Sequence, residues 1–283
     1  MRARMRIRVR HETSYGFSEP VHLERHEVRL RPRADPSIRI ERFSIAIAPE
    51  ATLRWHLDPV GNAVAMCDFE RPTSALRLEV EADVETTARD PFDFLLDAHA
   101  IELPVRVDRE DAAMLAPYRT RRRSPEDPVG ALAARVLAAN GPGTVAVVAA
   151  LCREVHGLVR SQRRQEGPAR APRRTLASGE GACRDIAVLL ADALRAIGLA
   201  ARFTSGWLAA PDAPAEPDLH AWSEVYLPGA GWRGFDASRG LAVDDQYVPL
   251  AASARPEGAA PVSGTFRGGA KAKLTSRLSV RGE

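Results

Sequence analysis

The first hundred residues alternate apolar and polar positions in short runs. A period of two is typical of strands that bury one face and expose the other. Turn-forming clusters rich in Pro, Gly, Asn and Asp separate the runs, and the alternation changes phase once near Glu41, which predicts a β-bulge. Residues 1–105 are therefore predicted to form an antiparallel β-sandwich. The clearest runs are 5–9, 38–47 and 76–84.

The pattern changes after about residue 105. Helices are predicted at 128–140 and 144–160, with Asn140-Gly141-Pro142-Gly143 between them. The charged segment 121–128 is interpreted as a linker or an extended arm. The polar segment 160–179 contains two prolines and is interpreted as a long surface loop.

The clearest helical pattern runs over 186–197, where apolar residues recur at intervals of three and four to form one stripe. Gly198 then stands where a glycine commonly ends a helix. Strand-like runs follow at 200–208, 219–227 and 231–236, and 271–281 has further strand character. This order predicts an α+β domain over residues 106–283.

Composition narrows the choice of environment. The 283 residues include 45% hydrophobic and 27% charged residues. No run approaches the roughly 18 apolar residues that span a bilayer, so no membrane partner is expected. Arginines alternate with apolar residues over 1–15, which disfavours a secretory signal. Three widely spaced cysteines without a CxxC pair argue against a disulfide framework, and we expect a cytoplasmic protein.

The net charge of +3 does not indicate a nucleic-acid partner. Nearly all of the 40 basic residues are arginines, and these are scattered along the chain. The basic runs are short and are not interleaved with aromatic residues, so we expect no nucleic-acid binding.

Cys183 directly precedes the striped helix, in Gly179-Glu180-Gly181-Ala182-Cys183-Arg184-Asp185. A cysteine at a helix N-terminus faces unpaired N–H groups and the positive end of the helix dipole, which favour the thiolate. Arg184 would add to this effect and Asp185 would oppose it. A small buried core residue is the more common fate of a lone cysteine.

His220 and Asp236 supply what a nucleophilic cysteine needs. His220 lies on a strand whose one face carries His220, Trp222, Glu224 and Tyr226, and Asp236 ends the next strand. If these strands pair as antiparallel neighbours, Asp236 can accept a hydrogen bond from His220, fix its tautomer and stabilise the imidazolium. The order and placement of the three residues predict a Cys183-His220-Asp236 site.

These segments resemble the bacterial transglutaminase-like family, whose core belongs with the papain-like cysteine enzymes. The resemblance covers nearly the whole chain and is most specific around Cys183, His220 and Asp236. The sequence departs from the family in having Ala237 after the aspartate, and in lacking an aromatic Phe-x-Tyr within 158–165. The segments that carry the resemblance are 11–15, 29–32, 58–62, 181–198, 201–207, 220–222, 231–236 and 244–264.

The resemblance implies an N-terminal β-sandwich followed by a papain-like, transglutaminase-like core. It also implies acyl transfer or hydrolysis through a thioester on glutamine carboxamide or peptide bonds, without a cofactor. A peptide or protein would be the substrate, with an amine as a possible acceptor. The backbone N–H of Cys183 is the expected first oxyanion donor, and Trp222, Gln162 and Gln165 are candidates for the second.

Other readings remain open at the level of sequence. The chain could be a non-catalytic module that keeps the fold and binds peptides or proteins. It could also be a related cysteine acyltransferase that acts on small amines. Metal binding by Cys183, His220 and Asp236 is disfavoured because paired ligand spacing is lacking, so no metal is expected.

Overall fold

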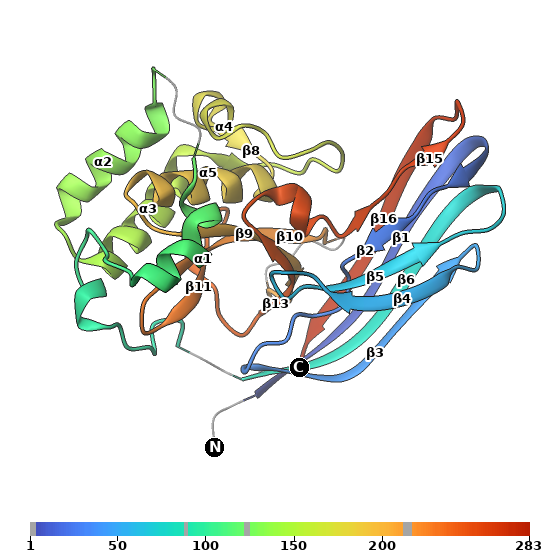
Figure 1. Cartoon of the computed structure of the whole chain (residues 1–283), viewed down its shortest axis with the longest axis horizontal. Helices are drawn as coiled ribbons and strands as arrows, with labels where there is room; N and C mark the ends of the chain where they lie inside the picture. The colour runs from blue at the N-terminus through green and yellow to red at the C-terminus, as the bar shows by residue number, and fades with distance from the viewer. Residues whose placement is uncertain (1–3, 88–89, 122–124, 212–216) are drawn as a thin grey trace.

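The computed structural model describes residues 4–87, 90–121, 125–211 and 217–283. One end of the molecule is built from long strands, and the other end contains the helices together with a further antiparallel sheet (Figure 1). This arrangement confirms the predicted α+β class. No helix among the described residues is long and apolar enough to cross a membrane.

Two antiparallel sheets face each other in the strand-rich part, as the alternating pattern predicts. Their inner faces share one core in which Ile7, Val28, Cys67 and Val80 are almost fully buried. The first sheet has the order β15-β1-β6-β3, with β16 also paired to β1, and the second has the order β14-β2-β5-β4. The strands of the first sheet are β1 (Arg4–Leu23), β3 (Ile38–Ala48), β6 (Thr73–Thr87), β15 (Phe266–Arg267) and β16 (Ala272–Gly282). Those of the second are β2 (His26–Val28), β4 (Thr52–Leu57), β5 (Ala63–Asp68) and β14 (Val262–Ser263).

The predicted bulge near Glu41 is present. The register between β3 and β6 shifts between Ile40 and Arg42, so Glu41 is the extra residue. The shift restores the inward phase for Phe43 and Ile45, both of which pack against the sandwich core.

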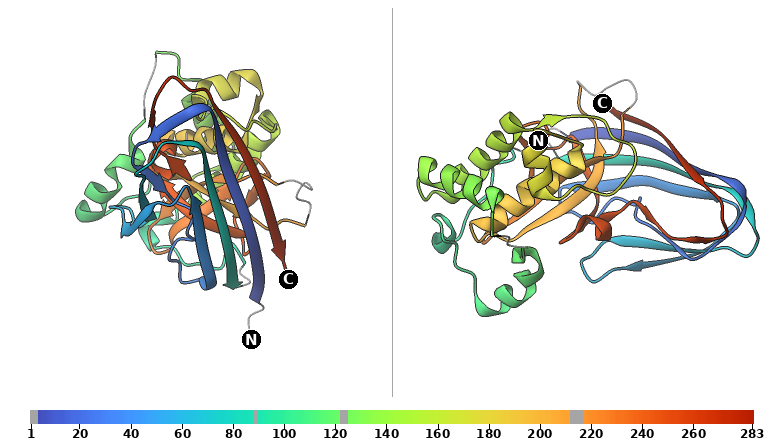
Figure 2. Two further views of the ribbon diagram at one scale, coloured as in Figure 1. Left: turned by 90° about the vertical axis from the view of Figure 1, so that its right-hand side faces the viewer. Right: turned by 90° about the horizontal axis from the view of Figure 1, so that it is seen from above.

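The C-terminal strands differ from the predicted domain division, which placed all of 106–283 in the second domain. Strand β16 instead pairs with β1 of the sandwich, from Ile7 opposite Gly282 to Phe17 opposite Ala272. Leu278 is buried in the sandwich core. The 20-residue β1 would otherwise leave a long unpaired edge, and β16 supplies the missing hydrogen bonds. The two ends of the chain therefore lie on the same sheet (Figure 2).

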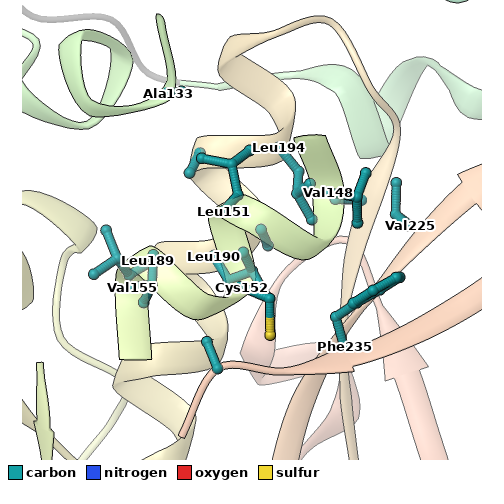
Figure 3. Packing of buried hydrophobic residues seen from close by; sticks show 14 of the residues in the cluster. Ala133, Val148, Leu151, Cys152, Val155, Leu189, Leu190, Leu194, Val225 and Phe235 are labelled. Carbon is teal, nitrogen blue, oxygen red and sulfur yellow. The ribbon is translucent and has the colours of Figure 1, made fainter. Parts of the chain in front are cut away.

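The main core of the helical part is a large cluster of buried apolar residues (Figure 3). Its central helix is α5, in which Ile186, Leu189, Leu190, Ala193 and Leu194 of the predicted stripe are fully buried and Ile197 is partly buried. Gly198, at φ +88°, follows the end of the helix as predicted. The helices are α1 (Arg109–Arg119), α2 (Pro128–Asn140), α3 (Thr144–Leu158), α4 (Pro172–Ser178) and α5 (Cys183–Ala196), with short 3₁₀ turns η1 (Ala98–Ala100) and η2 (Pro256–Ala259).

The central helix packs on an antiparallel sheet of order β12-β11-β10-β9-β13. Val225 and Phe235 of this sheet belong to the same core as α5. The strands are β9 (Ala201–Leu208), β10 (His220–Leu227), β11 (Gly231–Asp236), β12 (Leu241–Ala242) and β13 (Tyr247–Ser253). A separate parallel pair, β7 (Arg160–Ser161) and β8 (Glu180–Gly181), leads into α5.

Two segments are more ordered than predicted. The interpretation of 160–179 as a loop is wrong over 172–178, where α4 begins at Pro172 and buries Thr175. Proline is favoured at the first position of a helix. A helix of one or two turns with a single buried residue shows no apolar stripe in the sequence. In the predicted linker 121–128, Arg121 is 7% exposed and binds Asp127 and Asp192. Residues 122–124 of that segment lie outside the described residues.

Candidate active site

Cys183 is the first residue of α5 and is half-buried. Strand β8 brings the chain to this point, and Gly181 is needed because an added Cβ would lie 3.0 Å from both the Asp185 and Thr175 side chains. The thiol therefore sits at the positive end of a 14-residue helix. Its Sγ lies 3.9 Å from the carbonyl oxygen of Leu219, the residue before His220.

Two charged residues, Arg184 and Asp185, follow Cys183, and both are hydrogen-bonded to nearby groups. Asp185 is fully buried, and its carboxylate accepts hydrogen bonds from the Arg164 guanidinium at 2.6 Å and from the backbone N–H groups of Arg170 and Ala182. Arg184 donates to the carbonyl oxygens of Arg164 and Glu166. Asp185 is thus neutralised by its partners, while the positive charge of Arg184 stays next to the sulfur.

His220 opens β10 and its Nε2 lies 2.7 Å from Oδ2 of Asp236, so the predicted hydrogen bond is present. Burial lowers the pKa of His220, but the hydrogen bonds and charges of Asp236 and Cys183 outweigh it and raise the pKa to about 10. The ring is therefore an imidazolium at neutral pH. With Nε2 bound to Asp236, Nδ1 is the nitrogen that faces Cys183.

Asp236 ends β11 and is 1% exposed. The antiparallel register of β10 and β11, with Ser223 opposite Phe235, brings the carboxylate beside the His220 ring. Burial raises the pKa of Asp236, but hydrogen bonds from His220, Ser238 and Tyr247 outweigh it and lower the pKa. The carboxylate is therefore ionised and paired.

Trp222 lies beneath the His220 ring and is 1% exposed. Its ring meets Tyr247 edge-on at 5.2 Å between centroids. A side chain at Gly206 would clash with it, since an added Cβ would be 2.5 Å from the Trp222 ring and 2.3 Å from the carbonyl oxygen of Val248. Burial favours a packing role for Trp222 over contact with a substrate.

The two glutamine candidates have different surroundings. Gln162 follows β7, and its backbone N–H donates to the carbonyl oxygen of Gly181 at 2.9 Å, two residues before Cys183. Gln165 is exposed on the loop that follows. The structure therefore brings Gln162, and not Gln165, to the cysteine segment.

Two residues at this site were not predicted. Ser238 donates its N–H and hydroxyl to Oδ1 of Asp236, and the Asp-Ala-Ser spacing of a turn was a usable signal for it. Tyr247 donates its hydroxyl to Oδ2 at 2.9 Å, and no sequence signal marked it. Among the described residues, no group of three or more His, Cys, Asp or Glu side chains is placed to hold a metal ion.

Comparison with known proteins agrees with this fold. The family model of the bacterial transglutaminase-like N-terminal region matches residues 7–85, and that of the transglutaminase-like superfamily matches residues 118–237. The chain belongs to the transglutaminase-like superfamily. The second match contains Cys183, His220 and Asp236.

Proteins similar to this chain match it over different shares of its length. An uncharacterized protein of Mycobacterium leprae (strain TN) is 24% identical over 93% of this chain and 94% of its own. One of Mycobacterium tuberculosis (strain H37Rv) is 36% identical over 26% of each chain. A solved structure from Cytophaga hutchinsonii, named as a proposed cysteine protease, covers 99% of this chain and 91% of its own with a TM-score of 0.76 and 20% identity. At that identity the likeness shows a shared fold, which includes the sandwich.

Proposed function

We propose that this transglutaminase-like protein is a cysteine-dependent enzyme that cleaves or transfers acyl groups of peptide or protein substrates. The observation that carries the proposal is the placement of Cys183 at the start of α5, beside the half-buried His220 and its buried partner Asp236. This arrangement stabilises a thiolate and holds a proton next to it, which is what nucleophilic catalysis by cysteine requires.

The chemistry follows from these groups. The Cys183 thiolate attacks the carbonyl carbon of a glutamine carboxamide or a peptide bond, and the carbonyl oxygen becomes an oxyanion. The C–N bond then breaks as the His220 imidazolium gives its proton to the leaving nitrogen, which departs as ammonia or an amine. A thioester to Cys183 remains, and His220 is neutral.

The second half returns the site to its starting state. Neutral His220 accepts a proton from an incoming amine or water, which attacks the thioester carbon and expels the Cys183 thiolate. An amine gives transamidation and water gives hydrolysis. The backbone N–H of Cys183 and the side chain of Gln162 are the proposed donors to the oxyanion.

Alkylation by iodoacetamide tests the nucleophile with controls inside the same chain. Cys67 and Cys152 are buried, and burial raises the pKa of their thiols to about 11 and about 12. Labelling at pH 6.5, mapped by peptide mass spectrometry, should therefore modify Cys183 selectively. Labelling of Cys183 no faster than Cys67 in the native protein would refute the proposal.

Turnover then separates the two chemical outcomes. Glutamine-donor peptides with an amine acceptor, and general peptide substrates, would be compared for the wild type and Cys183→Ala. Ammonia release with an acylated amine indicates transamidation, and a new carboxylate indicates hydrolysis. The non-catalytic binding module remains the alternative, and equal retention of a peptide by both proteins without any turnover would favour it.

A further inference from the structure

The carboxylate of Asp236 is held by four donors, one of which comes from a distant strand. Ser238 donates twice to Oδ1, while Oδ2 accepts from His220 at 2.7 Å and from Tyr247 at 2.9 Å. Ser238 thereby holds Oδ1, the oxygen that does not contact His220. The Tyr247 hydroxyl holds Oδ2, the oxygen that also accepts from His220, with a donor from a different strand.

We infer that Tyr247 is a positioning residue of the active site and that the N-terminal β-sandwich holds it in place through β13. This inference rests on the proposed function, because it assigns a role within the same site. It also gives the sandwich a role in the chemistry, although Cys183, His220 and Asp236 all lie outside it.

Tyr247 fits this role by its surroundings. The residue is 3% exposed, and its ring packs against Trp222 at 5.2 Å and against His220 at 6.0 Å between centroids. Burial and the charge of Asp236 raise the pKa of Tyr247, so its hydroxyl keeps the proton that it donates. One side chain thus contacts both members of the His220-Asp236 pair.

The sandwich holds the chain on both sides of Tyr247 by hydrogen bonds and by packing. Thr86 of β6 donates its hydroxyl to the carbonyl oxygen of Asp245 at 2.7 Å, two residues before Tyr247. Val248 and Leu250, just after it, are fully buried in the core of the sandwich. The backbone of Arg33 donates to the carbonyl oxygen of Pro249 at 2.8 Å.

A turn of the sandwich holds β13 by two further hydrogen bonds. Asn62 is fully buried, and its amide exchanges two hydrogen bonds with the backbone of Ala252, at 2.8 and 3.0 Å. Asp58 and Arg33 hold this amide in turn. Strand β13 is an outer strand of the core sheet, and the sandwich supports it on the side away from β9 (Figure 1).

The ionisable groups around the pair come from several elements. Cys183 of α5 faces His220, Cys152 of α3 lies near Asp236, and Arg239 lies beside the Tyr247 hydroxyl. Removing the Tyr247 hydroxyl takes a hydrogen-bond partner from Asp236 and from Arg239 and leaves Cys183 and Cys152 unaltered. Oδ2 then loses the Tyr247 donor, so the His220 ring is held less firmly beside the sulfur and stabilises the thiolate less.

The test is the pH dependence of Cys183 alkylation by iodoacetamide. The wild type sets the reference position of the acid limb. Tyr247→Phe keeps the ring contacts but should move the limb to higher pH and slow alkylation at pH 6.5 by roughly 3- to 10-fold, a loss of about one hydrogen bond. Asp236→Asn sets the largest shift attainable.

A double-mutant cycle tests the link to the sandwich. Thr86→Val removes the hydrogen bond to the carbonyl oxygen of Asp245, just before β13. In the wild type it should shift the acid limb in the same direction but by less. In Tyr247→Phe it should cause no further shift. Thr73→Val, at the far end of the same strand, is the matched control and should change nothing.

The outcomes separate the two claims. Wild-type Cys183 that reacts no faster than Cys67 would remove the proposed function itself. Selective alkylation of Cys183 with the same acid limb in wild type and Tyr247→Phe would overturn the role of Tyr247. Equal effects of Thr86→Val in both backgrounds would overturn the link to the sandwich.

Discussion

Arg164 and Asp185 form an ion pair with 2.6 Å between guanidinium and carboxylate, directly behind the nucleophile candidate. Asp185 is fully buried and also caps α5 through the N–H of Ala182, so one side chain joins the helix start to the segment 164–170. The position of Cys183 therefore depends on the buried carboxylate of Asp185. Its hydrogen-bond partners offset the free-energy cost of burying this charge.

Arg164→Ala should destabilise the protein strongly, because it leaves the Asp185 carboxylate buried with one charged partner fewer. Breaking a buried pair from one side costs about 3–5 kcal/mol. Urea unfolding would measure the change. Arg160→Ala is the control, since the Arg160-Glu180 pair is 79% and 37% exposed and should contribute at most about 1 kcal/mol. Similar losses in both variants would contradict this account.

The raised pKa of His220 predicts how stability depends on pH. Because the folded protein holds this proton more tightly than the unfolded chain, the contribution is complete below about pH 6.5 and is lost as the pH rises toward about 10. The lowered pKa of Asp236 acts in the opposite range, since its contribution is lost only in acid.

The wild type should therefore lose its stability advantage over His220→Asn between about pH 6.5 and 10, as the imidazolium loses its proton. Urea unfolding of both proteins at pH 6, 8 and 10 measures the difference. A constant difference over this range would show that His220 does not bind its proton more tightly in the folded state.

Close packing beneath the site gives a further prediction. Gly206→Ala should push Trp222 and the carbonyl of Val248 apart, because the new Cβ would lie 2.5 and 2.3 Å from them. Overpacking of this kind costs about 1–3 kcal/mol or more. Thermal unfolding with tryptophan fluorescence would report both the stability and the environment of Trp222.

Gly16→Ala is the matched control for that substitution. Gly16 lies on an exposed position of β1, and an added Cβ would meet nothing within 4 Å. Alanine there should be neutral or stabilise slightly, by roughly 0.5 kcal/mol, since glycine weakens a strand. If both variants melt alike, the contact between Gly206 and Trp222 is not tight.

Local patterns predicted the parts of the fold that one segment determines by itself. The stripe 186–197, the alternation of β6 and the bulge at Glu41 each follow from residues close in sequence. The His220-Asp236 contact was within reach because β10 and β11 are consecutive and joined by a short turn.

Long-range pairing decided the rest. The pairing of β16 with β1 joins residues more than 250 positions apart, and its alternating pattern fits either domain equally well. Tyr247 is absent from the prediction for the same reason: β13 joins the far edge of β9, and only this pairing brings its first residue to Asp236. Helix α4 has too few buried residues to show a period.

Substitution can also identify the side chain that supplies the second hydrogen bond to the oxyanion. Gln162 is bound through its backbone to Gly181, two residues before Cys183, whereas Gln165 is exposed. If the Gln162 side chain supplies this hydrogen bond, Gln162→Ala should lower kcat by about 10²–10³ with KM nearly unchanged. Alkylation of Cys183 by iodoacetamide, which forms no oxyanion, should keep its rate. Gln165→Ala should change neither. A loss of alkylation in Gln162→Ala would indicate that the cysteine segment has moved, and an unaltered kcat would assign the donor elsewhere.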